Sequence, residues 1–565
     1  QMWLLKLIGN GKASEFLRAD ENLIETDTFM RWLNLTGDAV EEAPHLIRDF
    51  KNILDAYCKG VNDAVLSIGT PFEFKLVGYT PDEWTPADSL LIAKMIGFVG
   101  LSQIQGDAEK LILQLIQNDL DIKQIKELFP SIQEELTEDF IQLIKKINLV
   151  RPIITKSNSW RHLIPDFSAS NNWVLSPKKT NSEKAILCGD PHLALQLPPV
   201  WYLAVLSGED TYLMGATVPG LPIIAIGRTP HLAWSATYGT ADVCDYFIEE
   251  VKNGKYRQGK NWIPFIVRNE LIRPKKKKPI NLKIYETKHG ILEGNPKEDG
   301  YYLSYGWTGK IQKGTAAQSF ENALRITRAQ SSEEAFDLFT GMTFASFNWV
   351  FADRAGNIGY QLGGLVPKQP AGTSGLLPYL GWDKNQEWDG IIDPHLYPRA
   401  YNPKSGFIVT ANQNLNDLGR IGPMKLPMSG YRAVRITQML KNKNKHTVED
   451  MKQIQYDRYS LQAEAFMSIV RPLLPNSENG KILRKWDLRY SSNSLGATLF
   501  ERIYHELVLL VFGENGPNRS EIVEFPLFSV LHGNFDRILL SKSSVWFGKK
   551  TRESLYGLAI KRGLR

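Results

Sequence analysis

The hydrophobic pattern of the chain changes near residue 150, and this change limits the possible folds more than any other feature of the sequence. Before it, apolar residues recur at the three-to-four spacing of amphipathic helices, as at Leu111 and Leu115. From residue 173 to about 251, the apolar runs are short and are separated by Gly and Pro, which is typical of β-strands. We therefore expect a mainly helical region over residues 1–150, followed by a region rich in strands.

Later segments carry both patterns. Residues 316–340 and about 447–513 have helical periodicity, whereas residues 346–362 have the pattern of a hairpin. Residues 151–169 are rich in Pro, Ser and Asn, and predict a surface segment that links the helical region to residues 170–565. The sequence therefore predicts one large α/β (α+β) unit, in which helices pack around substantial sheets.

Composition excludes several classes of protein. Of the 565 residues, 43% are hydrophobic and 23% are charged, which excludes disordered, collagen-like and coiled-coil chains. The net charge of +6 does not call for nucleic acid or an acidic membrane surface, and the lysine run at residues 275–278 is typical of a solvated loop. Three cysteines exclude a disulfide framework. We expect no membrane insertion, because the sequence has no apolar run of about 18 residues.

Common catalytic signatures are absent from the sequence. It contains no HExxH helix, no GxSxG elbow, no Walker A loop and no GxGxxG motif. These absences exclude the usual metalloproteases, serine hydrolases, NTPases and dinucleotide enzymes. Residues 176–179 match SxxK, but a pattern of four residues arises often by chance.

The most specific signal lies between Ser170 and Asp245, in motifs at residues 170–175, 189–193, 215–222 and 232–245. In this order and spacing they resemble the penicillin acylase family of N-terminal-nucleophile amide hydrolases. The resemblance implies a four-layer αββα sandwich with a mainly helical α-part. It also implies a small-molecule acyl amide as the substrate, with no organic cofactor.

The resemblance assigns the nucleophile to Ser170. A serine hydroxyl is a weak nucleophile near neutral pH and needs an adjacent base. Cleavage of the Ala169–Ser170 bond would free the α-amino group of Ser170, whose usual pKa of about 7.7–8.0 lets it accept the hydroxyl proton. We therefore expect an inactive precursor that cleaves itself into α and β chains, of which the second begins at Ser170.

Three further residues have catalytic roles by resemblance. The backbone N–H of Tyr238 and the side chain of Asn348 would stabilise the oxyanion. His192, 22 residues after Ser170, would orient the serine and its amine. A structural Asn in a bulge and a turn histidine remain the alternatives. Relatives carry a helpful arginine after the Asn348 hairpin, where this chain has Pro-Lys-Gln at residues 367–369.

Asp242 and Asp245 flank the main-chain carbonyl of Cys244, which offers oxygen ligands to a hard cation. By resemblance this is a structural calcium site, and Glu109 is the glutamate that would complete it. Two aspartates in a solvated turn are the alternative interpretation.

By resemblance, Leu193 and Ile226 occupy two positions of the acyl pocket, which are phenylalanines in relatives that prefer phenylacetyl groups. Removing aromatic rings leaves room and loses ring stacking. We therefore expect aliphatic acyl chains to fit better than phenylacetyl.

Specificity and location stay open at this stage. The substrate could be a penicillin or an N-acyl-homoserine lactone, and the resemblance implies a periplasmic or extracellular protein. It also implies that further strands precede Gln1 and that a further segment follows Arg565. A non-catalytic binding scaffold is the rival interpretation, which Ala169 favours because many relatives carry Gly there.

Overall fold

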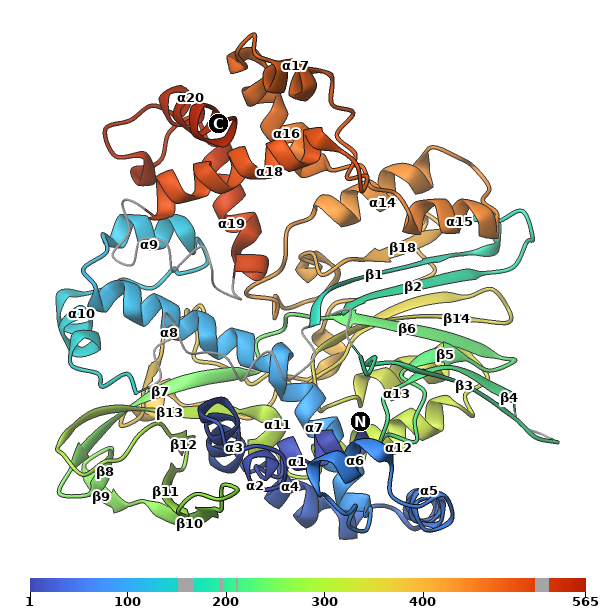
Figure 1. Ribbon diagram of the computed structural model, residues 1–565, viewed down its shortest axis with the longest axis vertical. Helices are drawn as coiled ribbons and strands as arrows, with labels where there is room; N and C mark the ends of the chain where they lie inside the picture. Colours follow the sequence, from blue (N-terminus) through green and yellow to red (C-terminus); the bar gives the residue numbers. More distant parts are fainter. Residues whose placement is uncertain (151–166, 194–196, 210–211, 514–527) are drawn as a thin grey trace.

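The computed structural model describes residues 1–150, 167–193, 197–209, 212–513 and 528–565 (Figure 1). Its first part is helical, as the periodicity predicts. Local signals set the helix ends: for example, Thr85 and Asp88 form a capping box at the start of α7. The helices are α1 (Met2–Gly9), α2 (Ala13–Phe16), α3 (Glu21–Leu33), α4 (Leu35–Glu42), α5 (Arg48–Ile68), α6 (Phe72–Val77), α7 (Pro86–Gly97), α8 (Gln103–Gln117), α9 (Ile122–Leu128) and α10 (Glu138–Lys145).

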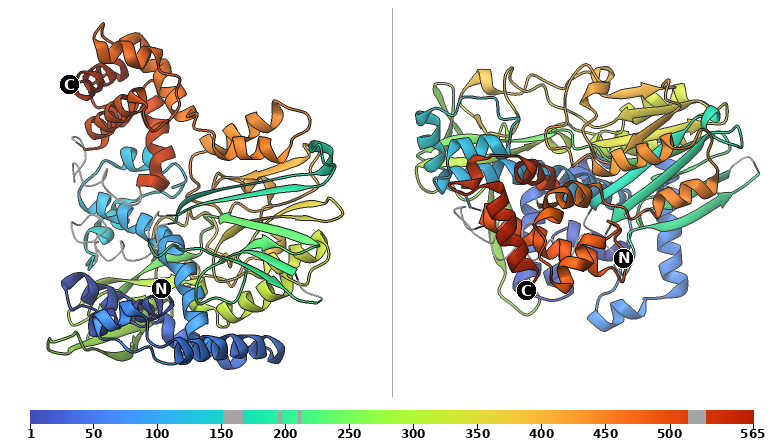
Figure 2. Two further views of the ribbon diagram at one scale, coloured as in Figure 1. Left: turned by 45° about the vertical axis from the view of Figure 1, so that its right-hand side comes forward. Right: turned by 90° about the horizontal axis from the view of Figure 1, so that it is seen from above.

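Two sheets stack face to face on the right-hand side of Figure 1, and helices cover both outer faces (Figures 1 and 2). One sheet has the order β18-β1-β2, and the other has the order β17-β15-β14-β6-β5-β4-β3. This is the predicted four-layer αββα sandwich. The strands are β1 (Phe167–Leu175), β2 (Ile186–Leu193), β3 (Tyr202–Ser207), β4 (Tyr212–Thr217), β5 (Ile226–Arg228), β6 (Leu232–Tyr238), β14 (Phe347–Asp353), β15 (Ile358–Leu362), β17 (Arg399–Tyr401) and β18 (Phe407–Thr410).

Apolar side chains hold the outer layers in place. Trp173 of β1 lies in one core with Ile436 of α14 (Tyr431–Lys441) and Met451 of α15 (Val448–Gln455). The seven-stranded sheet is the larger sheet of the sandwich, and we call it the larger sheet below. Its Trp234 and Phe351 pack against α12 (Thr315–Ile326) and α13 (Ser332–Thr340). Each helix pair therefore buries its apolar face against one sheet.

The space between the two sheets is partly polar. Because side chains alternate along a strand, Ser170 and Asn172 of β1 face away from the apolar core around Trp173. The hydroxyl of Ser235 on β6 donates to Asn172 Oδ1 over 2.9 Å, and Thr237 Oγ1 lies 3.2 Å from Thr410 Oγ1. This alternation of side chains along β1 therefore points Ser170, the predicted nucleophile, toward the sheet that carries Tyr238.

A second large sheet lies beside the sandwich, with the order β10-β11-β12-β13-β7-β8-β9 and with β16 paired to β7. Residues 239–243 connect β6 of the sandwich directly to β7 of this sheet. Its strands are β7 (Cys244–Lys252), β8 (Lys255–Gln258), β9 (Asn261–Pro264), β10 (Ile266–Ile272), β11 (Ile280–Thr287), β12 (Gly290–Leu292), β13 (Gly300–Trp307) and β16 (Tyr379–Leu380).

Buried polar contacts tie the helical first part to the rest of the chain. Lys94 of α7 forms an ion pair of 2.6 Å with Glu42 of α4, and its ammonium also donates to the carbonyl of Gly309 in α11 (Thr308–Ile311) over 3.1 Å. Glu42 Oε2 accepts a bond of 3.0 Å from the N–H of Ala316. These direct contacts join α4, α7, α11 and α12.

The chain ends in a group of helices above the sandwich (Figures 1 and 2). They are α16 (Leu461–Val470), α17 (Glu478–Lys485), α18 (Leu495–Val508), α19 (Phe528–Leu540) and α20 (Arg552–Gly563). Among the residues described here, no helix combines the length and the apolar composition needed to cross a membrane.

The structure confirms the predicted hairpin, since β14 and β15 pair antiparallel, but β1 begins at Phe167, before the strand pattern that the sequence shows from residue 173. The polar run at residues 168–172 lies within β1, because β2 and β18 supply hydrogen-bonding partners on both sides. The apolar run at residues 223–225 precedes β5, which begins only at Ile226. The expected linker at residues 151–166 lies outside the described residues.

Candidate active site

Ser170 lies in β1, only 9% exposed, and the Ala169–Ser170 bond is continuous with the strand. Its hydroxyl donates to the carbonyl oxygen of Ala169 over 2.6 Å. Its backbone N–H donates to Oδ1 of Asn412 over 2.9 Å. The hydroxyl and the peptide nitrogen of the predicted cleavage point are therefore both held in defined positions.

Asn412 and Arg432 surround Ser170, and the sequence analysis identified neither. Asn412 follows β18 with a left-handed φ of 64°, which Asn tolerates better than most residues. Its amide donates to the carbonyl of Tyr238 over 2.9 Å. The guanidinium of Arg432, in the first turn of α14, donates to the carbonyl of Ser170 over 2.6 Å and to Asn412 Oδ1 over 3.0 Å.

Arg432 places a positive charge beside Ser170. Burial lowers the pKa of its guanidinium to about 10, and the negative charge of Asp190 opposes that shift. Arg432 therefore remains protonated at neutral pH. A fixed cation beside an amine disfavours the protonated form of that amine. The site would thus lower the pKa of an amino group placed at the Ser170 nitrogen.

Asn348 is fully buried in β14, and its amide is engaged within the larger sheet. It donates to Thr237 Oγ1 over 3.2 Å and to the carbonyl of Tyr238 over 3.1 Å, while Oδ1 accepts from the Tyr360 hydroxyl over 2.9 Å. Within the described residues, the asparagine side chain bonded to Ser170 is Asn412. The side chains of Asn348 and Asn412 both donate to the carbonyl of Tyr238.

His192 lies on β2, where its backbone pairs with Ala169. Its Nε2 is 3.1 Å from Oδ2 of Asp190 and 3.3 Å from Nδ2 of Asn171. The hydrogen bond from His192 lowers the pKa of the Asp190 carboxyl, although burial opposes this effect. Since Asn171 Oδ1 also accepts from Arg432 over 2.7 Å, His192 belongs to the same polar cluster as Ser170.

A cavity of ≈ 90 Å³ opens at Ser170 and runs along the face of the larger sheet that α12 covers. Both predicted pocket residues, Leu193 and Ile226, lie on its wall. The Tyr238 hydroxyl donates to the carbonyl of Leu101 over 3.0 Å, so the ring of Tyr238 faces the cavity without an unpaired polar group. The other lining residues are Ile96, Ala169, Pro191, Trp201, Val218, Leu221, Ile223, Ile224, Ala225, Trp234, Ala236, Ala323, Ile326, Met342, Phe344, Phe347, Trp349 and Met428. Such a wall suits an apolar group attached to a carbonyl at Ser170.

Glu109, Asp242 and Asp245 form a buried group of carboxylates where β6 passes into β7. Burial raises the pKa of each, and for Glu109 the nearby charges of Asp245 and Asp242 raise it further. The pKa of Asp242 rises to about 7. The amide of Gln369 donates to Asp242 over 2.7 Å and to Asp245 over 3.0 Å, so Gln369 lies at this cluster rather than at Ser170.

These carboxylates only partly fit a calcium site. Glu109 Oε1 and Asp242 Oδ1 are buried without a hydrogen-bond partner, which leaves two oxygens for a cation. Cys244 directs its thiol to the carbonyl of Ser102 over 3.1 Å. In the part of the chain that the structure describes, however, no three His, Cys, Asp or Glu side chains converge to hold a metal ion. The amide of Gln369 bridges Asp242 and Asp245 instead.

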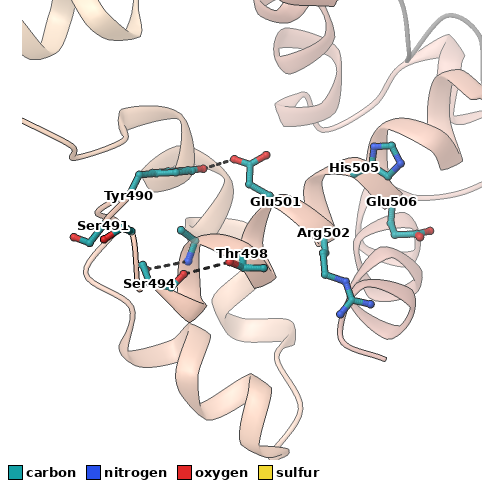
Figure 3. Close-up of a pocket in the computed structure, with 10 residues that line it drawn as sticks. Tyr490, Ser491, Ser494, Thr498, Glu501, Arg502, His505 and Glu506 are labelled. Atoms are coloured by element: carbon teal, nitrogen blue, oxygen red, sulfur yellow. Dashed lines mark hydrogen bonds between the residues drawn. The ribbon is translucent and has the colours of Figure 1, made fainter. Parts of the chain in front are cut away.

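A second hollow, an open groove of ≈ 640 Å³, lies along α18 (Figure 3). Tyr490 bonds to the carboxylate of Glu501, and the Ser494 hydroxyl caps the first turn of α18. The groove shares no lining residue with the cavity at Ser170. Of these two hollows, the cavity at Ser170 combines an apolar wall with a buried serine that is bonded to the Arg432 guanidinium, so we take it as the candidate active site.

The four-layer sandwich is the fold of N-terminal-nucleophile hydrolases. The sequence profile described as penicillin amidase matches residues 1–560, and the chain therefore belongs to that family. A thermostable penicillin G acylase from Alcaligenes faecalis has a similar fold, with a TM-score of 0.61 and 21% identity over 70% of this chain and 77% of that chain.

Two curated relatives extend the comparison. An acyl-homoserine lactone acylase QuiP of Pseudomonas fluorescens (strain Pf0-1) is 29% identical over 92% of this chain and 67% of its own length. The penicillin acylase 2 proenzyme of Pseudomonas sp. (strain SE83) is 28% identical over 91% of this chain and 68% of its own length. The chain thus spans about two-thirds of the length of these relatives.

Proposed function

We propose that the protein is a self-processed amidohydrolase that cleaves the acyl amide of a small molecule, in the periplasm or outside the cell. The observation that carries this proposal is the hydrogen bond of 2.6 Å between the Ser170 hydroxyl and the Ala169 carbonyl. This bond lies beside a buried apolar cavity. Intact mass and N-terminal sequencing of the purified protein test the proposal. A second chain that begins Ser-Asn-Asn-Trp, with hydrolysis of acyl amides, would support the proposal; a single uncut, inactive chain would favour the binding scaffold.

Processing would follow from the position of the Ser170 hydroxyl. Oγ attacks the carbonyl carbon of Ala169, the C–N bond breaks, and the nitrogen takes up the hydroxyl proton. Water then hydrolyses the resulting ester, which leaves a carboxylate on Ala169 and a free α-amine on Ser170. The acyl shift itself needs no other nucleophile, since both reacting groups belong to one dipeptide, and water enters only in the second step.

Turnover would use the amine that processing creates. Asn412 Oδ1 already holds the Ser170 nitrogen, and the charge of Arg432 would keep the amine neutral enough to accept the hydroxyl proton. Oγ attacks the substrate carbonyl, the amine protonates the leaving group, and water releases the acid. We assign the oxyanion donors to the Asn412 amide and the Tyr238 N–H, because Asn412 rather than Asn348 contacts Ser170. His192 and Asn171 would orient this cluster.

We expect octanoyl amides to be hydrolysed faster than phenylacetyl amides of the same chromogenic amine. Aliphatic Leu193 and Ile226 line the cavity, so a flexible chain can fill the space that rings occupy in phenylacetyl-preferring relatives. The ratio of the two kcat/KM values measures this preference. Ile226→Phe should move the ratio toward phenylacetyl, whereas a clear phenylacetyl preference in the unchanged protein would disprove the assignment.

The names of the relatives suggest which leaving groups to test. N-acyl-homoserine lactones and penicillins are the substrate classes that those names give. Both present an acyl amide to the serine, so the apolar cavity does not separate them. We propose that substrates of this acyl-amide class bind with the acyl chain in the cavity and the amine part outside it.

We also propose a structural calcium ion at Glu109, Asp242, Asp245 and the Cys244 carbonyl, for which the two unpaired oxygens are the support. Bound calcium would offset the repulsion among the carboxylates, and the Gln369 amide would have to give way. Excess CaCl2 should therefore raise the Tm near pH 8. A free calcium concentration about 100 times the Kd would stabilise the folded state by about 2.7 kcal/mol.

The pH dependence of the calcium effect has a definite sign. Without calcium, a carboxyl whose folded pKa is raised stabilises the fold at low pH, and this contribution is lost as the pH rises through about 7, the pKa of Asp242. The increase in Tm should therefore shrink below about pH 7. Asp245→Asn is the matched control, which should remove the response, and an equal response to MgCl2 or none to CaCl2 would contradict the proposal.

A further inference from the structure

A buried carboxylate with no part in the proposed reaction lies among the helices above the sandwich. Asp536 of α19 is only 1% exposed. It accepts hydrogen bonds from the Tyr504 hydroxyl of α18 over 2.7 Å and from the Gln462 amide of α16 over 3.1 Å. The hydroxyl of Tyr431 in α14 also interacts with this carboxylate. Asp536 therefore joins four helices at one buried point.

The interaction with Tyr431 connects Asp536 to the active site. Tyr431 is the first residue of α14, and the next residue is Arg432, which donates to Ser170 and Asn412. The backbone before α14 is also held, since Gly533 of α19 packs so closely that a Cβ there would lie 3.3 Å from the Cα of Ser429. Helix α19 thus contacts the segment that carries Arg432 at two successive points.

We propose that Asp536 is a positioning residue: through Tyr431 it fixes the first turn of α14, so that Arg432 reaches Ser170 and Asn412. The proposal rests on the role assigned above to Arg432. The first N–H groups of a helix have no intrahelical acceptors, and Gly430 at the N-cap of α14 supplies no side-chain cap, so contacts from other helices help to position this turn. The bonds of Arg432 to these two residues, at 2.6 and 3.0 Å, leave little room for displacement.

Tyr431→Phe and Tyr504→Phe form a matched pair that tests this inference. Each removes one hydroxyl from Asp536, and we expect similar losses in Tm. Only Tyr431→Phe should lower kcat per processed chain, by about tenfold or more, because misplacement of about 1 Å can cost about 10²-fold. KM should change little, since Tyr431 does not line the cavity. Equal kcat in the two folded variants would overturn the proposal.

A second readout does not depend on activity. Phenylglyoxal modifies accessible guanidinium groups, and peptide mass spectrometry reports the rate at Arg432. We expect modification several-fold faster in Tyr431→Phe than in the unchanged protein, and no change in Tyr504→Phe. If the unchanged protein hydrolyses no acyl amide, the proposed function fails, yet the labelling still decides whether Tyr431 holds Arg432. Identical labelling of all three proteins would refute the positioning role.

Discussion

Replacing Ser170 by alanine should leave a single uncut chain of 64.0 kDa without measurable acyl-amide turnover. The variant lacks the hydroxyl that would attack both the Ala169 carbonyl and the substrate. Loss of a catalytic nucleophile typically costs about 10⁶-fold in kcat. Intact mass under denaturing conditions and hydrolysis of a chromogenic octanoyl amide measure the two effects.

Ser176→Ala is the matched control for this prediction. Ser176 follows β1 and begins the SxxK pattern, so it tests the motif that the sequence analysis set aside. The control should be cut and active like the unchanged protein. Cleavage of the Ser170→Ala variant at the same bond, or turnover close to that of the unchanged protein, would rule out Ser170 as the nucleophile.

Asn412→Asp should lower kcat by about 10²-fold or more, which is the usual effect of losing one oxyanion donor. The carboxylate replaces the amide NH2 with an acceptor that repels developing negative charge. Aspartate tolerates the left-handed backbone at this position, where φ is 64°, so the variant should fold. Steady-state kinetics per processed chain and the Tm separate the catalytic effect from the structural one.

Asn348→Asp is the corresponding change at the residue that the sequence analysis favoured. Its amide links β14 to the carbonyl of Tyr238 and to the Tyr360 hydroxyl, so this variant should mainly lower the Tm. We expect kcat to fall by less than about tenfold, well below the effect of losing a donor to the oxyanion. A larger kcat effect at Asn348 than at Asn412 would return the oxyanion role to Asn348.

The helical first part and the hairpin could be predicted from the sequence because they depend on local periodicity, whereas the four layers were implied by the family resemblance. Helical spacing marked the first part of the chain, and the alternation in residues 346–362 marked the hairpin that became β14 and β15. The same reasoning did not predict the first half of strand β1. Its polar residues at 168–172 look like a loop, and only the pairing with β2 and β18, distant in the chain, makes them a strand.

Residues of the site could be predicted from the sequence only where they lie in a recognisable motif. Ser170 carries a specific motif, whereas Asn412 lies 242 residues away in a polar segment and reaches Ser170 only through the packing of β18 beside β1. Arg432 lies in none of the motifs that the sequence analysis recognised. Asn348 attracted attention because Asn is unusual among aromatic residues in a strand, and Tyr360 supplies a structural reason for it.

The buried contacts of Lys94 and Glu42 with α11 and α12 have a consequence for the thermodynamics of the cut protein. An uncut chain unfolds as one molecule, so its Tm is independent of protein concentration. After cleavage before Ser170, the same contacts would lie between two separate chains. Unfolding would then also be dissociation, and its midpoint would rise with concentration. A single hydrolysed bond would thus turn a unimolecular folding equilibrium into a bimolecular one.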